Sequence, residues 1–392
     1  MAHRVLCCSG SLEGGGSERQ LWQLATGLEP DRLAAEIYLI FRRGMYLAQV
    51  PERIPIIDFE SSYQPRRGYW PGRMRRAQIR HLTQTLRTRR IACVYDRTFH
   101  MTLLTAAACR RANVPRLSVI VSPPSRDLGQ SRERYRWFKR RLLAAAYRAP
   151  QCWPLAVADA VADDAAQYYG IPRQRFRTLP SPIDVAAIAQ AAEAADAAQS
   201  LRQAPAGCFK ISVVGRLSAE KGQALALEAL AHLQSRLPGQ PLRLSLIGDG
   251  PARQSLQRLA EQLGVAEQVH FTGHVLNPYP WMAASDVICI PSHYEGLPNV
   301  ALEAMCLGIP LLATECGGAI VQLCGAQERG VVAPGEARAL AAALQDRWHQ
   351  AAAWHARAAA AQVWVRRHHG LQPWLEQMHT LLEQRIEARK NP

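Results

Sequence analysis

The 392-residue sequence lacks the features that mark membrane-spanning, secreted and disulfide-rich proteins. It contains no run of 18 or more apolar residues, so we expect no membrane-spanning helix. The apolar run at residues 5–8 is too short for the core of a secretion signal and is expected to form a buried strand. The ten cysteines are scattered without Cys-x-x-Cys spacing, which indicates reduced, mostly buried thiols and a cytoplasmic location.

An Asp-x-Asp triplet is also absent from the sequence. A transferase that depends on Mg²⁺ or Mn²⁺ usually carries such a pair of carboxylates to chelate the ion. The absence therefore predicts metal-independent chemistry, and we expect neither a metal site nor a resident cofactor.

Acidic residues are scarce in the first 150 residues. This part holds 27 Lys and Arg against 11 Asp and Glu, a net charge of +16. The whole chain has a net charge of +15, so residues 151–392 carry about −1. A strongly basic half indicates an anionic partner, and nucleic acid is one candidate. We find no recognised nucleic-acid-binding motif, so we expect no nucleic-acid partner.

Two stretches of the basic part, residues 66–90 and 131–148, combine arginine with aromatic side chains such as Trp70 and Trp137. Arginine and aromatic residues on one helix are typical of proteins that bind an anionic membrane surface. The alternative is a solvated, Arg-rich helix face that packs its own aromatic side chains. We expect peripheral attachment to the inner face of the membrane through both stretches.

Strand-like apolar runs alternate with helix-like runs in both halves of the chain. This alternation predicts an α/β protein with two Rossmann-like domains, whose parallel sheets face an inter-domain cleft. The expected divisions are a first domain at 1–186, a linker at 187–207, a second domain at 208–365, and a C-terminal helix at 366–392 that returns toward the first domain.

The segment 292–305 follows the strand-like run 287–290 and opens a helix. Backbone N–H groups at a helix start bind anions, and Gly296 lets the backbone approach a ligand closely. Glu295 in the loop and Glu303 in the first helical turns would flank such a ligand. A carboxylate can accept two hydrogen bonds from the hydroxyl groups of a ribose or hexose. The alternative is a pair of surface carboxylates beside a helix cap.

A second loop, residues 215–222, follows the strand-like run 211–214 and carries Arg216 and Lys221. Two cations at one loop suit a pyrophosphate, because arginine supplies a planar fork of donors and lysine a compact charge. Solvated loop charges are the alternative. Two further strand ends lead into glycine turns, at 248–251 and at 272–273, and taken alone such turns are common in α/β folds.

These four pieces, GRLSAEKG, GDGP, VHFTG and PSHYEGLPNVALEAMCLGIPLLAT, together resemble the C-terminal domain of glycosyltransferase family 4, which has the GT-B fold. The last piece contains the family's Glu-x7-Glu element. The resemblance implies that a nucleotide-sugar donor binds here, with the diphosphate on Arg216 and Lys221. It further implies that Glu303 holds the ribose and that Glu295 lies by the transferred sugar. Backbone amides of Gly296, Leu297 and Asn299 would contact the sugar and the phosphate. Thr272 and Gly273 would lie near the base.

The N-terminal half resembles the family less closely. The loop at 14–19, with Gly15 and Gly16, looks like the family's first glycine loop, which approaches the donor phosphate and the acceptor. Several relatives carry a histidine where this chain reads Ser-Pro-Pro at 122–124. His100, which follows an earlier strand, is the candidate catalytic residue in its place, with Asp96 and Asp127 as alternatives.

The resemblance implies a retaining glycosyltransferase that moves a hexose from a UDP- or GDP-sugar to a glycan or lipid-linked acceptor, in cell-envelope polysaccharide or lipopolysaccharide synthesis. The expected catalytic residues are Glu295, Arg216, Lys221 and His100. With no metal, the cations and helix N-termini would stabilise the departing diphosphate. A nucleotide-sugar epimerase or hydrolase on the same fold, and an inactive nucleotide-sugar-binding protein, are the alternatives.

Overall fold

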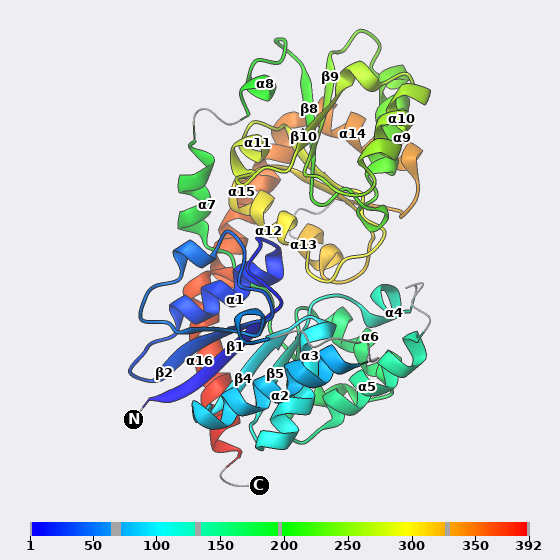
Figure 1. Ribbon diagram of the computed structural model, residues 1–392. Coiled ribbons are helices and arrows are strands. Elements are labelled where there is room, and N and C mark those ends of the chain that lie inside the picture. The colour runs from blue at the N-terminus through cyan, green and yellow to red at the C-terminus, as the bar shows by residue number, and fades with distance from the viewer. Residues whose placement is uncertain (1, 64–71, 130–134, 195–197, 326–329, 390–392) are drawn as a thin grey trace. The chain divides into compact units, whose positions relative to one another are not determined.

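The computed structural model describes residues 2–63, 72–129, 135–194, 198–325 and 330–389. The chain divides into two compact units, one formed by residues 1–181 with 372–392 and the other by residues 182–371. Each unit is built around one parallel sheet with helices packed on it (Figure 1), which confirms the predicted α/β class. Within the described residues, we find no helix with the length and apolar character needed to cross a membrane.

The first unit has a seven-stranded sheet in the order β3-β2-β1-β4-β5-β6-β7, and all its strand pairs are parallel. The order changes direction between β1 and β4, and such a switch point is where open α/β sheets bind ligands. The strands are β1 His3–Ser9, β2 Leu33–Leu39, β3 Ile56–Asp58, β4 Cys93–Arg97, β5 Arg116–Ile120, β6 Cys152–Ala156 and β7 Arg177–Thr178.

Helix packing on this sheet follows the apolar spacing of the sequence. In α2, Ile79, Leu82 and Leu86 recur on one face, and all three are buried in a cluster with Leu104 and Ala108 of α3. Helix α3 packs against both α2 and α5. The helices of this unit are α1 Gly16–Gly27, α2 Arg73–Thr88, α3 Phe99–Ala112, α4 Pro124–Asp127, α5 Arg136–Arg148, α6 Asp159–Tyr169 and α16 Leu371–Glu387.

A buried ion pair lies between the sheet and these helices. Asp96 of β4 and Arg116 of β5 are 0% and 1% exposed, and 3.7 Å separates their charged atoms. The hydroxyl groups of Thr102, Thr105 and Ser118 donate to the Asp96 carboxylate at 2.6, 2.8 and 2.7 Å. Arg116 donates to the carbonyl oxygen of Ala146 at 2.6 Å. All of these partners come from the fold itself, so Asp96 has a structural role.

The last helix, α16, belongs to the first unit although it comes from the other end of the chain. Its Glu383 forms a two-point ion pair with Arg32, at 3.1 and 3.0 Å. His379 accepts a hydrogen bond from the backbone N–H of Glu29 at 3.2 Å, and Arg385 donates to the carbonyl oxygen of Pro150 at 2.7 Å. These contacts fix α16 to segments that lie between 235 and 351 residues away in sequence.

The second unit has a six-stranded parallel sheet in the order β10-β9-β8-β11-β12-β13. Its switch point lies between β8 and β11, so the loops that follow these two strands meet at the carboxyl edge of the sheet. The strands are β8 Phe209–Val214, β9 Leu242–Ile247, β10 Val269–Gly273, β11 Val287–Ile290, β12 Leu311–Thr314 and β13 Val331–Val332.

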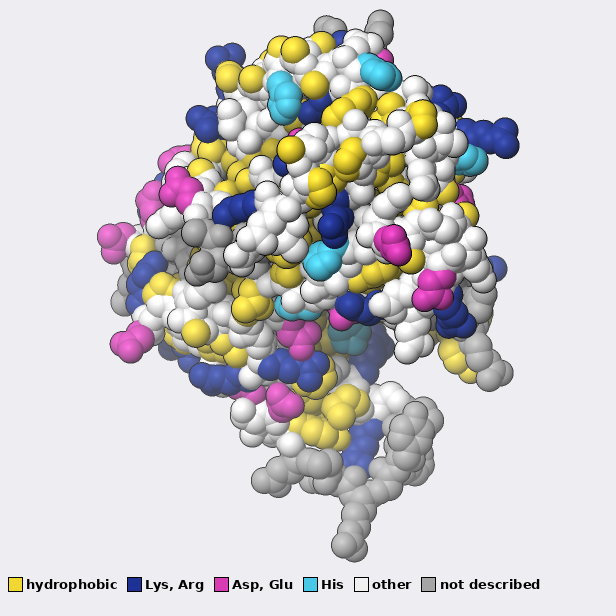
Figure 2. Space-filling model, turned by 90° about the horizontal axis from the view of Figure 1, so that it is seen from above, with side chains coloured by type: hydrophobic (Ala, Val, Ile, Leu, Met, Phe, Trp, Pro, Cys, Tyr) yellow, Lys and Arg dark blue, Asp and Glu magenta, His cyan; other side chains and the backbone are white. Residues whose placement is uncertain are grey.

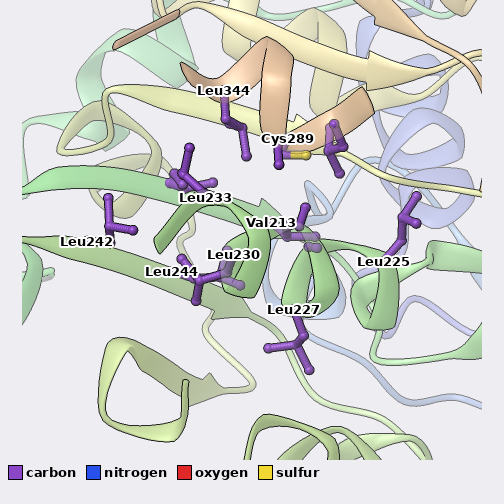
Figure 3. Close-up of a cluster of buried hydrophobic side chains, with 14 of the residues drawn as sticks. Val213, Leu225, Leu227, Leu230, Leu233, Leu242, Leu244, Cys289 and Leu344 are labelled. Carbon is purple, nitrogen blue, oxygen red and sulfur yellow. The ribbon is translucent and has the colours of Figure 1, made fainter. Parts of the chain in front are cut away.

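The core of this unit lies between the sheet and two helices, α9 and α14. Figure 3 shows Leu230 and Leu233 of α9 among Val213, Leu244 and Leu344, which come from β8, β9 and α14. The helices are α7 Val185–Ala192, α8 Gln199–Arg202, α9 Gln223–Arg236, α10 Arg253–Gln262, α11 Tyr279–Ala283, α12 Asn299–Cys306, α13 Ile320–Gly325, α14 Ala337–His349 and α15 Ala351–His369.

The segment expected as a linker, residues 187–207, is counted with the second unit, and the division falls after residue 181 instead of 186. Asp184 caps α7 by accepting the N–H of Ala187 at 3.0 Å. Asn277 donates to the carbonyl oxygen of Ala191 at 2.7 Å, and α7 packs on α11 and α12. These contacts hold the start of the segment on the second unit. At its other end, this unit extends to residue 371 rather than 365.

Nine of the ten cysteines are buried free thiols in the structure. Burial raises the pKa of Cys289 to about 12, which keeps that thiol protonated and unreactive. On the face of the molecule seen in Figure 2, basic, acidic and apolar side chains are interspersed, without one continuous patch of a single sign.

The Asp96–Arg116 pair provides a test of this packing. Replacing Asp96 with alanine leaves a buried guanidinium without its carboxylate, and we expect the free energy of unfolding to fall by about 3–5 kcal/mol. Chemical denaturation followed by circular dichroism measures the change. The matched control is Asp31→Ala, which removes the same charge from an exposed position and should change stability by less than about 0.5 kcal/mol. Equal effects of the two substitutions would contradict a structural role for Asp96.

Candidate active site

Two side chains from opposite sides of the β8/β11 switch point form an ion pair. Lys221, in the loop after β8, donates from Nζ to Oε1 of Glu295, in the loop after β11, at 2.7 Å. The hydroxyl group of Ser292 donates to the same carboxylate oxygen at 2.8 Å. The side chains of Lys221 and Glu295 are 31% and 12% exposed, so the pair is reachable from solvent but partly shielded. The structure thus brings together two of the residues singled out from the sequence.

Close backbone contact between the two loops keeps this pair in place. Gly222 has φ +65°, and a Cβ atom there would lie 1.9 Å from the carbonyl oxygen of Pro291. Only glycine allows this approach. The N–H of His293 donates to the carbonyl oxygen of Glu220 at 2.9 Å. The loop that carries Lys221 is therefore tied directly to the loop that carries Glu295.

The end of β12 supports the Glu295 loop from the other side. Thr314 donates to the carbonyl oxygen of Ser292 at 2.6 Å, and the N–H of Glu295 donates to the carbonyl oxygen of Cys316 at 3.1 Å. The N–H of Ala319 donates to the carbonyl oxygen of Gly296 at 2.8 Å. With its backbone held on both sides, the loop presents the Glu295 carboxylate in one orientation.

Helix α12 follows this loop, as the sequence predicts, and begins at Asn299. Gly296 and Leu297 lie in the turn just before it, and Glu303 lies one helical turn further on. The Glu303 side chain is 5% exposed. A carboxylate so buried persists only where polar partners satisfy it, which makes Glu303 a fixed group rather than a surface charge.

Arg216 lies in the same loop as Lys221, and its side chain is exposed. Its carbonyl oxygen accepts a hydrogen bond from the side-chain amide of Gln223 at 2.9 Å, which anchors the loop to the start of α9. The guanidinium group itself forms no hydrogen bond or ion pair within the described part of the chain. Its donors are thus available to a bound anion.

The turns after β9 and β10 extend the site along the sheet. A Cβ atom at Gly248 would lie 2.2 Å from the carbonyl oxygen of Gly215, so the β9 turn presses against the β8 loop. The hydroxyl group of Thr272 accepts the N–H of Gly248 at 3.3 Å and donates to the carbonyl oxygen of Gly273 at 2.9 Å. Thr272 therefore joins the two turns, a role that its spacing did not indicate.

The remaining candidates lie in the first unit. Gly15 precedes α1, which begins at Gly16, and both follow β1 at its carboxyl end. His100 is exposed in the first turn of α3, directly after β4. Loss of hydration and the positive charges of Lys139 and Arg75 hold the pKa of His100 below its ordinary value.

The two aspartates considered as alternatives to His100 have partners within the fold. Asp96 is enclosed with Arg116, as described above. Asp127 accepts a hydrogen bond from Ser122 at 2.7 Å, next to the Ser-Pro-Pro segment. The described residues contain no group of three or more His, Cys, Asp or Glu side chains placed to hold a metal ion.

Three further residues contribute in ways that the sequence did not reveal. The hydroxyl group of Ser292 donates to Glu295, and Thr314 donates to the backbone carbonyl oxygen of Ser292, a contact that depends on β11 and β12 being neighbours. Thr98 has φ +71° and ψ 145°, a conformation rare outside glycine, at the turn between β4 and His100. Such strain is often stored at functional sites, and no sequence pattern signals it here.

Comparison with known families assigns the chain. Residues 14–187 match the family model described as Glycosyltransferase Family 4, and residues 208–350 match the one described as Glycosyl transferases group 1. The lipopolysaccharide core biosynthesis glycosyltransferase LpsD of Rhizobium meliloti is 33% identical over 134 residues, which are 34% of this chain and 37% of that protein. The chain matches less than half the length of such curated relatives.

Solved structures show the same architecture. The structure of Anabaena HepE in complex with UDP-glucose has a TM-score of 0.79 and 22% identity, covering 97% of this chain and 99% of that one. The structure of WaaG, a glycosyltransferase involved in lipopolysaccharide biosynthesis, has a TM-score of 0.73 and 19% identity, covering 97% and 99%. At these identities the likeness shows the fold. Two family models that together span most of the chain, on a fold shared with GT-B glycosyltransferases, establish that this chain belongs to the family 4 group of glycosyltransferases.

Proposed function

We propose that this protein is a retaining, metal-independent glycosyltransferase. It moves a hexose from a UDP- or GDP-sugar to a glycan or lipid-linked acceptor, in the synthesis of cell-envelope polysaccharide or lipopolysaccharide. The observation that carries the proposal is the Lys221–Glu295 pair across the β8/β11 switch point. The complex of HepE with UDP-glucose and the role of LpsD in lipopolysaccharide core synthesis add support.

The donor diphosphate binds between Arg216 and Lys221 in this proposal. Arg216 offers free guanidinium donors, and Lys221 lies where a phosphate oxygen can share its ammonium group with Glu295. Glu303 then accepts hydrogen bonds from the ribose hydroxyl groups, one helical turn from the amides of Leu297 and Asn299. Thr272 and Gly273, at the edge formed by β10, lie on the side proposed for the base.

The two cations also make departure of the diphosphate possible without a metal. Charge that develops on the leaving group is stabilised by donors that are already in place, so little reorganisation is needed. Lys221 and Ser292 both donate to the Oε1 atom of Glu295, which suits a positioning role for this carboxylate. We therefore propose attack by the acceptor on the face from which the diphosphate leaves, with Glu295 positioning the sugar.

The membrane is the second proposed partner. Residues 66–71 and 131–134 of the two basic stretches lie outside the described residues. In the described part, Trp137 and Phe138 of α5 are 59% and 50% exposed, and Met74 of α2 is 49% exposed. A helix face that packed its own aromatics would bury them, so this exposure favours insertion into an anionic membrane surface.

Removal of Glu303 tests the donor site. Thermal melting with a panel of UDP- and GDP-sugars identifies the donor, because a bound ligand stabilises the folded state with the logarithm of its excess over Kd. We expect Glu303→Ala to lose both this stabilisation and transfer. Glu267→Ala, an exposed glutamate of the same unit, should retain both. If Glu303→Ala turned over donor as fast as the wild type, the donor-site assignment would be wrong. If the wild type released free sugar or an epimer and formed no acceptor product, the hydrolase or epimerase alternative would be favoured.

Glu295→Gln tests the catalytic step. The neutral amide cannot form an ion pair with the Lys221 ammonium group, so we expect kcat to fall by about 100-fold or more, with nucleotide binding kept in thermal melts. Ser292→Ala removes one donor to the same oxygen and should have a smaller effect. The assay contains excess EDTA, and proton NMR reads the anomeric configuration of the product. Loss of wild-type transfer in EDTA would contradict metal independence, and an inverted product would contradict retention.

Vesicle binding tests the membrane partner. The double substitution Trp137→Ser, Phe138→Ser should weaken sedimentation with anionic vesicles at low salt, because two exposed apolar side chains are lost. Leu276→Ser, at a residue 71% exposed in the second unit, is the matched control and should bind like the wild type. If wild-type binding to anionic vesicles is absent, or does not weaken with salt, the membrane proposal fails.

A further inference from the structure

A buried arginine at the end of β4 has no counter-charge in the first unit. Arg97 is 5% exposed and donates from Nη1 to the hydroxyl oxygen of Tyr95 at 2.9 Å. Its Nε atom is buried without a hydrogen-bond partner, and Arg97 forms no ion pair within the described ranges of the chain. A guanidinium group keeps its proton in a protein, so this side chain stays charged where a buried lysine could become neutral.

Asp96, the carboxylate next to Arg97 in sequence, lies on the opposite face of the sheet. Successive side chains of a strand point to opposite faces. Asp96 points toward α3, where Thr102 donates to it, and it pairs with Arg116. Arg97 and Tyr95 point to the other face, where side chains of α1 and α16 lie against them. The carboxylate of Asp96 therefore cannot balance the charge of Arg97.

A small cavity lies against Arg97 on this second face. It has a volume of about 10 Å³, and its lining includes Tyr95 of β4, Gln20 of α1, and Trp374 and Met378 of α16. None of the described residues that line it is an aspartate or a glutamate. Burial raises the pKa of Tyr95, so its hydroxyl group stays protonated and adds no negative charge. The cavity thus combines a fixed positive charge with room for one water-sized particle.

We propose that this cavity binds a single chloride ion, held by the guanidinium group of Arg97. A monatomic anion balances the buried charge and accepts the hydrogen bond that Nε can donate. A water molecule in the same place would leave the charge unbalanced, which is costly in a buried site. Phosphate and carboxylate groups contain several heavy atoms and exceed the volume of the cavity. The site is therefore separate from the one proposed for the donor diphosphate, and the inference does not rest on the proposed function.

The chloride ion lies where the first and last helices of the first unit meet β4. Gln20 and Met378 both line the cavity, so the binding site is complete only when α1 and α16 are packed on the sheet. A ligand that binds the folded state and not the unfolded chain stabilises the folded state. Chloride should therefore stabilise the packing of α16 on the first unit.

Thermal melting of the full chain in sodium salts tests chloride binding. At equal ionic strength, exchange of gluconate for chloride should raise the wild-type Tm by roughly 2–5 °C for each tenfold increase in chloride above Kd. Arg97→Met removes the charge and keeps an unbranched side chain, and it should lose the difference between the two salts. Arg110→Gln, at an exposed position in the last turn of α3, is the matched control and should keep it. An equal response to chloride in Arg97→Met and the wild type would contradict the proposal.

Bromide provides a direct measurement that holds even if Arg97→Met does not fold. Crystals of the wild-type protein are grown or soaked in sodium bromide, and diffraction is recorded at the bromine absorption edge. We expect an anomalous peak in the cavity beside Arg97. An ordered water molecule in the cavity without an anomalous signal, or bromide peaks confined to the protein surface, would overturn the proposal.

Discussion

The ion pair between Lys221 and Glu295 is the contact on which the candidate active site depends. It joins two loops that belong to strands on opposite sides of a switch point, and those loops are in turn held by the Gly222–Pro291 approach and by the end of β12. The backbone of each of these two loops is therefore held by its neighbours, whereas the Arg216 guanidinium group stays exposed. Such support holds Lys221 and Glu295 in place before any ligand binds.

The parts of the site that sequence could predict are those set by local pattern. A strand followed by a glycine loop and a helix places Arg216, Lys221, Glu295 and the start of α12 at the same edge of a parallel sheet, and the structure has them there. The distances between loops could not be predicted from the sequence, because they depend on the order of the strands in the sheet. The contact of Lys221 with Glu295 spans 74 residues and exists only because β8 and β11 are neighbours.

Side chains that could have either a structural or a functional role were the hardest to assign from the sequence. Asp96 is a carboxylate near the end of a strand, where it could be catalytic. Only the pairing of β4 with β5 shows that Arg116 and Ser118 enclose it. Thr272 ends a strand where a ligand contact is plausible, yet its hydroxyl group joins two turns. In both residues, a polar group that could contact a ligand also has a partner on a neighbouring strand or turn, and only the strand order shows that partner.

The return of α16 to the first unit has a consequence for synthesis of the chain on the ribosome. The first unit cannot be completed until residues 372–392 have been made, whereas the second unit, residues 182–371, is already whole at that point. The face of the first unit that α16 covers therefore stays exposed to water while the second unit folds. A chaperone that recognises exposed apolar surface would meet the nascent chain at this face, and release would coincide with the arrival of the last helix.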